Sequence, residues 1–131
     1  MLTRRSLTLL ALCGLSRGGV AQERYYVIYF RWKSTSLHPT MQRRVAEAAL
    51  SAKQLGSTRI VVVGHTDTSL SDAESMAISL LTAKAVADEL IRNGVAQETI
   101  SLTATGEENL FKPTADGVIE PYNRRVEVCI R

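Results

Sequence analysis

Apolar residues along this chain follow two spacings, one typical of strands and one typical of helices. Residues 25–32 combine aromatic and β-branched side chains and predict a first strand. Continuous or alternating apolar residues predict three further strands at 59–63, 100–105 and 124–130. Two longer stretches with helical spacing separate the first three strands. Because strands alternate with helices and a last strand follows, we expect an α/β (α+β) two-layer sandwich on a mixed sheet.

The first expected helix begins at Pro39 and ends at Gly56, which should adopt the left-handed conformation of a C-terminal cap. Apolar side chains recur along it every three or four residues and should cover the sheet. They are Met41, Val45, Ala48, Ala52 and Leu55.

The second expected helix runs from about Asp72 to Asn93. Ser71 and Glu74 have the spacing of a capping box at its start. Its core-facing residues should be Met76, Leu80, Ala83, Ala87, Leu90 and Ile91. Three apolar residues fall on the opposite, polar arc: Ile78, Leu81 and Ala85. Two hypotheses stay open for them, cover by another segment of the same domain or a surface that binds a protein partner of the cell envelope.

The first 21 residues differ from the rest and predict a secretory signal peptide, followed by one domain at 22–131. Arg4 and Arg5 precede a short apolar run, and Gly19-Val20-Ala21 has the small residues of a cleavage site. The apolar run is shorter than the roughly 20 residues of a spanning helix, so we expect no transmembrane segment in the mature chain. Export by the Sec or the twin-arginine route, and lipidation of Cys13, both stay open.

Removal of this leader changes the charge of the chain. The whole sequence has 16 basic and 13 acidic residues, and the leader carries three arginines and no acid, which leaves 13 of each. The mature chain therefore lacks the basic excess typical of a nucleic-acid binder. Cys129 would be its only cysteine, so we expect a small packed residue without an internal disulfide.

The candidate site follows the most apolar strand, where Gly64 is succeeded by His65, Thr66 and Asp67. Asp67 should lie between the end of a strand and the start of a helix, where open α/β sheets bind ligands. His38 is the only other histidine, so we expect no metal site and a structural role for His65. No phosphate-binding loop or activated nucleophile is recognisable, so we expect neither an enzyme nor a cofactor.

Four short motifs occur in one order: Gly64-His65-Thr66-Asp67, Asn93-Gly94-Val95, Gly106-Glu107 and Asn123-Arg124-Arg125-Val126-Glu127. Together they resemble the OmpA-like C-terminal domain family. The resemblance implies a βαβαββ fold with helices on one face and a periplasmic location, with association to the outer membrane as an option. It also implies non-covalent binding of peptidoglycan through the diaminopimelate of the stem peptide, without catalysis or metal.

The resemblance implies a ligand-binding role for Asp67, whose carboxylate would hold the ammonium of diaminopimelate. Loop amides from Thr66 through Thr68 to Ser69 would hold its carboxylate. The family arginine on the second helix is replaced by Thr82, and Arg31 stands where an acidic residue is common. Loss of a charged hydrogen bond worth about 1.5 to 3 kcal/mol predicts roughly ten- to a hundredfold weaker binding.

Arg124 is a further candidate contact, with structural ion pairing of Arg124 and Arg125 as the other interpretation. The alternative function is a degenerate OmpA-like module that binds an envelope protein and has lost wall binding. The helix arc with Leu81 at its centre would then form the interface.

Overall fold

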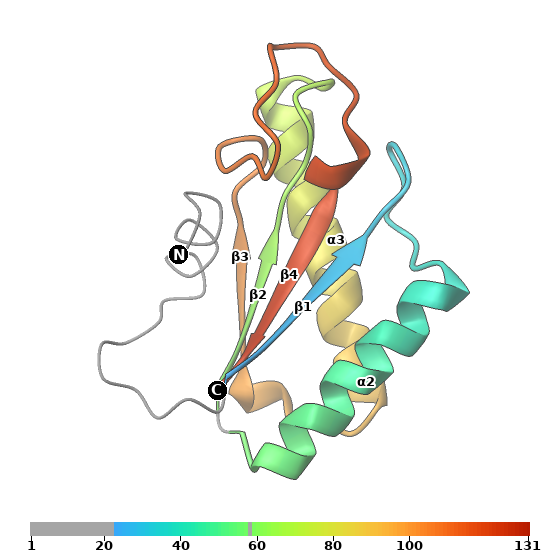
Figure 1. Ribbon diagram of the computed structural model, residues 1–131, viewed down its shortest axis with the longest axis vertical. Coiled ribbons are helices and arrows are strands. Elements are labelled where there is room, and N and C mark those ends of the chain that lie inside the picture. The colour runs from blue at the N-terminus through green and yellow to red at the C-terminus, as the bar shows by residue number, and fades with distance from the viewer. Residues whose placement is uncertain (1–22, 58) are drawn as a thin grey trace.

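The computed structural model describes residues 23–57 and 59–131, so the expected signal peptide lies outside the described residues. A four-stranded sheet carries two long helices on one face (Figure 1). The elements are β1 (Arg24–Tyr29), α2 (Pro39–Leu55), β2 (Ile60–Gly64), α3 (Asp72–Arg92), β3 (Ile100–Ala104) and β4 (Arg125–Ile130), with short 3-10 turns η1 (Gln97–Thr99) and η2 (Pro121–Asn123). The two-layer α+β sandwich with βαβαββ order is therefore confirmed.

The strand order β1-β4-β2-β3 brings three loops to one edge of the sheet. β4 lies between β1 and β2 and is antiparallel to both, while β2 and β3 are parallel. The last residues of β1 and β2 therefore lie beside the first residues of β4, because Tyr29 pairs with Arg125 and Gly64 with Val126. The last residue of β3, Ala104, pairs with Gly64 at the same end of the sheet. The loops that leave β1, β2 and β3 meet at this upper edge (Figure 1).

α2 covers the sheet as its apolar spacing predicts. Its buried residues are Val45, Ala48, Ala49 and Ala52, with Met41 and Leu55 partly buried at either end. The helix ends at Gly56, whose φ of 62° is the left-handed conformation expected for a C-terminal cap.

α3 buries small residues instead of the large ones that its pattern predicts. Ala83, Ala87 and Leu90 are buried as expected, but Met76, Leu80 and Ile91 are 43%, 49% and 37% exposed, so their predicted core position is wrong. The remaining buried residues are Ser75, Ser79, Thr82 and Val86.

Close approach of α3 to β2 explains this difference. A Cβ on Gly64 would lie 1.9 Å from the carbonyl oxygen of Ser79, so the helix backbone rests almost on the strand. Only small side chains fit in so narrow a space, and the larger ones turn to the helix flanks. The N-cap prediction is confirmed, since the Ser71 hydroxyl accepts the N–H of Glu74. On the other arc, Leu81 is 51% exposed, and residues 78 and 85 are half-buried.

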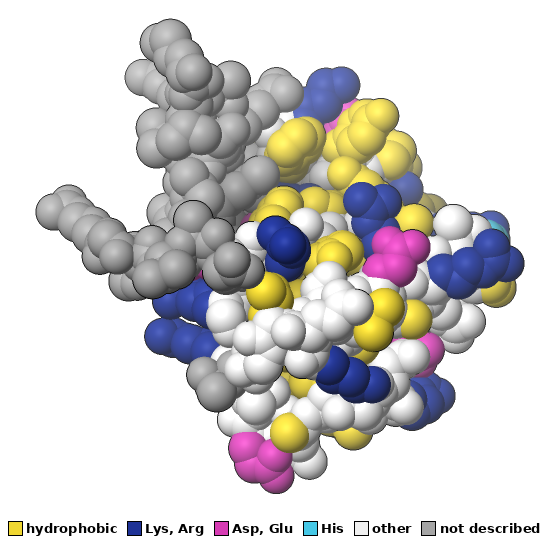
Figure 2. All heavy atoms as spheres, turned by 60° about the horizontal axis from the view of Figure 1, so that its bottom comes forward, with side chains coloured by type: hydrophobic (Ala, Val, Ile, Leu, Met, Phe, Trp, Pro, Cys, Tyr) yellow, Lys and Arg dark blue, Asp and Glu magenta, His cyan; other side chains and the backbone are white. Residues whose placement is uncertain are grey.

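The opposite face of the sheet has a smaller apolar cluster of Val61, Val63 and Cys129. Cys129 is buried, as expected for a small packed residue. Seen from the lower end, Lys and Arg side chains are spread among acidic and uncharged ones (Figure 2). Within the described ranges, no helix combines the length and the apolar character that crossing a bilayer requires.

Candidate functional site

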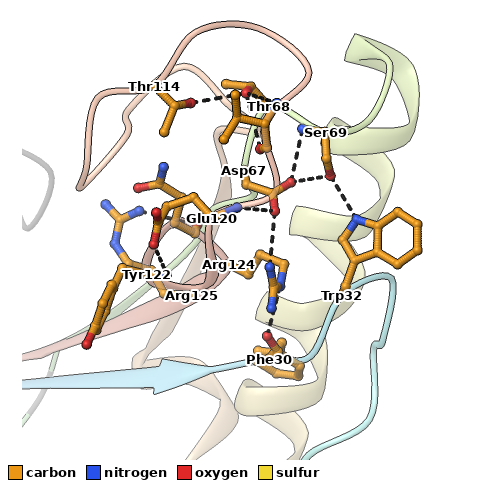
Figure 3. Close-up of polar contacts among 12 residues, drawn as sticks. Phe30, Trp32, Asp67, Thr68, Ser69, Thr114, Glu120, Tyr122, Arg124 and Arg125 are labelled. Carbon is orange, nitrogen blue, oxygen red and sulfur yellow. Dashed lines mark hydrogen bonds and ion pairs between the residues drawn. The ribbon is translucent and has the colours of Figure 1, made fainter.

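Asp67 lies at the upper edge of the sheet, in the loop that connects β2 to α3. Its Oδ1 accepts the backbone N–H of Ser69 at 3.1 Å and the Ser69 hydroxyl at 2.5 Å. Its Oδ2 accepts the backbone N–H of Glu120 at 3.1 Å and Nη1 of Arg124 at 3.2 Å (Figure 3). Both carboxylate oxygens therefore have two donors from the chain itself, and the residue is 1% exposed.

This arrangement differs from a carboxylate that points outward at a ligand. A loop aspartate that bonds a backbone amide two residues ahead forms an Asx turn, which stabilises the loop by itself. The guanidinium of Arg124 also neutralises the negative charge of Asp67. Contact between Asp67 and a ligand stays a prediction, and it requires a ligand group to replace one of these donors.

Arg124 joins three segments of the chain at this point. Besides its ion pair with Asp67, its Nε donates to the carbonyl oxygen of Phe30 at 3.2 Å, just after β1 (Figure 3). Its side chain is 15% exposed. The ion pairing expected for Arg124 is thus present, and it supplies Asp67 with a guanidinium from the segment before β4 instead of from α3.

Trp32 belongs to the same hydrogen-bond chain, although the sequence provided no reason to select it. The indole N–H donates to Oγ of Ser69 at 2.8 Å, and that hydroxyl donates to Asp67 (Figure 3). The ammonium of Lys33 lies 4.9 Å from the centre of the indole ring. The loop between β1 and α2 is therefore fastened to the loop after β2, directly beside Asp67.

The three candidate threonines are all buried. The N–H of Thr66 donates to the carbonyl oxygen of Gly106 at 2.8 Å. The Thr68 hydroxyl donates to the carbonyl oxygen of Ala115 at 2.7 Å, which ties the β2–α3 loop to the long loop before β4. Two of the four amides expected to face a ligand, those of residues 66 and 69, are therefore used within the chain.

Thr82 lies apart from this network. It is 3% exposed on the sheet-facing side of α3, and its hydroxyl donates to the carbonyl oxygen of Ser79 at 3.1 Å. This contact is a helix-internal bond, typical of a threonine within a helix. The structure thus brings Arg124 to Asp67, beside Thr66 and Thr68 of the same loop, and it shows no hydrogen bond between Asp67 and Thr82 among the described residues.

A buried charged cluster supports the same edge from the other face of the sheet. Oε1 of Glu127 lies 2.6 Å from Nη2 of Arg125 and 2.9 Å from Nε2 of His65, and all three side chains are nearly inaccessible. Nδ1 of His65 lies 2.8 Å from the Thr105 hydroxyl. Because a carboxylate only accepts hydrogen bonds, neutral His65 places its proton on Nε2. Its Nδ1 faces the Thr105 hydroxyl, which also donates to the carbonyl oxygen of Gly64 at 3.1 Å.

Burial lowers the pKa of His65, because a charged imidazole would lose its hydration, although the neighbouring Glu127 opposes this shift. Arg125 already balances the charge of Glu127, so His65 has little to gain from protonation. Its role is structural, as expected. In the part of the chain that the structure describes, no group of three or more His, Cys, Asp or Glu side chains is arranged to hold a metal ion.

The fold defines a class of protein: small α+β domains with a mixed sheet and helices on one face. A sequence model of the OmpA family matches residues 29–124, and the chain belongs to this family.

Three curated relatives have informative names. An outer membrane protein of Gluconacetobacter diazotrophicus is 35% identical over 82% of this chain and 30% of its own length. The peptidoglycan-associated lipoprotein of Pseudomonas aeruginosa is 35% identical over 76% of this chain and 59% of its own. A peptidoglycan-binding protein of Mycobacterium tuberculosis is 30% identical over 79% of this chain and 32% of its own. The chain thus spans less than two thirds of the length of these relatives.

Two solved structures share the fold. The peptidoglycan-associated lipoprotein of Burkholderia pseudomallei aligns with a TM-score of 0.74 at 23% identity, over 81% of this chain and 90% of that one. The OmpA-like domain of FopA1 from Francisella tularensis aligns with a TM-score of 0.72 at 20% identity, over 83% of this chain and 75% of that one.

Proposed function

We propose that this chain binds peptidoglycan non-covalently in the periplasm, by contact with the stem peptide, and that it does so without catalysis. Membership of the OmpA family and two relatives named for peptidoglycan support this function. The observation that carries the proposal is the match over residues 29–124, which includes Asp67 at the edge where three loops meet.

The same geometry supports weaker binding than we expect for a family member with an arginine at the position of Thr82. Arg124 and Ser69 already occupy the carboxylate of Asp67, so a ligand ammonium has to compete with them. Thr82 supplies no guanidinium for a ligand carboxylate. One missing charged hydrogen bond is worth about 1.5 to 3 kcal/mol, which corresponds to a loss of roughly ten- to a hundredfold in affinity. Several copies bound to one wall would offset part of this loss by avidity.

Retention of the protein on purified sacculi tests the function and the site together. Asp67→Asn keeps the shape of the side chain but removes its charge, and we expect about tenfold lower retention. Asp88→Asn is the matched control, because Asp88 is an exposed acid on α3 away from this edge. Absence of wild-type retention would reject the function. Equal retention of wild type and both variants would reject Asp67 as the site.

A second candidate function is binding of an envelope protein through the outer arc of α3. The observation that favours it is Leu81, which is 51% exposed between the half-buried Ile78 and Ala85. Leu81→Arg should then release a partner that copurifies with the wild-type protein, while circular dichroism shows an unchanged fold. Sacculi would retain neither protein if this function replaces wall binding.

A further inference from the structure

A hollow of about 510 Å³ is lined in part by Arg124 and by no residue of the β2–α3 loop. It is formed by the end of β1, the β1–α2 loop and the start of α2. Its polar lining comes from Arg31, Ser34, Ser36, His38 and Arg124, and no carboxylate side chain lines it. Its volume falls within the range of roughly 300 to 1,000 Å³ that is typical of small-ligand sites.

The free charge in this hollow is positive. Arg124 is balanced by Asp67, but the exposed guanidinium of Arg31 has no hydrogen-bond or ion-pair partner among the described residues. The surrounding sequence strengthens this excess, since residues 24–46 contain five basic residues and no acidic one. An anion that enters the hollow therefore meets no opposing carboxylate on its walls.

Side chains, and not the helix terminus, supply the donors here. The amides of residues 41 and 42 donate to the carbonyl oxygen of His38, and the amide of Thr40 donates to Nδ1 of His38 at 3.2 Å. Because Nδ1 accepts this bond, neutral His38 has its proton on Nε2 and can donate from there. Arg31 adds the planar fork of donors that fits a carboxylate with two parallel hydrogen bonds.

We propose that this hollow binds a free carboxylate of the stem peptide, with Arg31 as its principal contact and His38 beside it. The choice of a peptide carboxylate rests on the proposed wall binding, whereas the preference for an anion rests on the hollow alone. In this proposal the protein supplies the positive group and the ligand the negative one, which is the reverse of a site built on an aspartate. Asp67 is neutralised inside the protein, and the unpaired charge offered to the ligand belongs to Arg31.

Trp32 provides a direct readout, because it is the only tryptophan, is 46% exposed and follows Arg31 in the loop. The whole protein is titrated with N-acetyl-D-alanyl-D-alanine and with its C-terminal amide, by Trp32 fluorescence and by calorimetry. We expect the acid to bind at least tenfold more tightly than the amide. Equal binding of both probes, or no binding of the acid by either method, would overturn the proposal. Equal binding of inorganic phosphate at matched ionic strength would overturn the carboxylate assignment.

A pair of arginine variants locates the contact. Arg31→Gln should weaken binding of the acid about tenfold, as expected for one charged hydrogen-bonding group. Arg43→Gln removes the same charge from an exposed position on α2 that does not line the hollow, and should change affinity less than twofold. Equal losses in the two variants would show a general charge effect and reject the site.

Sacculi retention, measured in parallel, separates this proposal from the proposed function. Retention of wild type and Arg31→Gln alike, with no response to the dipeptide acid, leaves wall binding intact and rejects the hollow. Arg31-dependent binding of the dipeptide acid without retention on sacculi supports the hollow as a carboxylate site and rejects wall binding.

Discussion

Replacement of Glu127 by glutamine tests whether the buried charged cluster holds the upper edge of the sheet together. Glutamine has nearly the same shape but no charge, so Arg125 would remain 2% exposed without its counter-ion at 2.6 Å. The carbonyl oxygens of Asn109, at 3.1 Å, and Asn123, at 3.5 Å, and the ring of Phe111, at 5.8 Å, would be left to solvate the guanidinium. None of these groups carries a formal negative charge.

The expected loss is about 3 to 5 kcal/mol of unfolding free energy, the usual cost of removing one partner from a buried ion pair. Such a loss is large beside the total stability of roughly 5 to 15 kcal/mol that is typical of a domain. The matched control is Glu89→Gln. Its ion pair with Arg92 spans 3.0 Å on the surface, where Arg92 is 72% exposed, and should be worth about 0 to 1 kcal/mol.

Urea unfolding followed by circular dichroism and by Trp32 fluorescence provides both free energies. Simultaneous replacement of Arg125 by methionine and Glu127 by leucine should restore part of the stability, because no uncompensated charge remains. A cost below about 1 kcal/mol for Glu127→Gln, similar to that of the surface control, would refute the view that this cluster stabilises the edge.

Two further predictions concern the same strand end. Gly64→Ala should lower the unfolding free energy by about 1 to 3 kcal/mol, because its Cβ would lie 1.9 Å from the Ser79 carbonyl oxygen. Gly56→Ala is the control, because its φ is 62° but no atom lies within 4 Å of the added Cβ, and it should cost about 1 kcal/mol of unfolding free energy in thermal melts. A smaller loss of unfolding free energy for Gly64→Ala than for this control would contradict the close approach of α3 to β2. The folded protein has a lowered His65 pKa, so the unfolded chain takes up the proton first, near pH 6.5. Stability should be complete above that pH and decrease as the pH falls through it, and His65→Gln should flatten this slope in urea unfolding at pH 7.5 and 5.5.

Local patterns in the sequence predicted most of the secondary structure correctly. β2 was expected at 59–63 and spans Ile60–Gly64, and the start of α3 at Asp72 follows from the serine cap before it. These features depend on residues that are close in sequence, namely apolar spacing, a capping hydroxyl and a glycine with φ of 62°. The ordered motifs extended this success to the family, which the match over residues 29–124 shows.

The buried residues of α3 were predicted less well, because the spacing of apolar residues does not reveal how closely the helix approaches the sheet. Met76 and Leu80 fit an apolar stripe, yet the helix rests so close to β2 that Ser75 and Ser79 occupy the interface. The separation between a helix and a sheet is a property of the packed molecule. The sequence does not show that Gly64 and Ser79 lie against each other, so it offered no reason to prefer serine over leucine in the core.

The sequence by itself determined where Asp67 stands: after a buried strand and before a capped helix. Only the tertiary structure decided what surrounds it. The donors to Oδ2 come from residues 53 and 57 positions away, and they reach it because β4 lies between β1 and β2. Strand order sets which distant loops meet, and local patterns contain little information about strand order. The ion pair between Asp67 and Arg124 is therefore a consequence of topology.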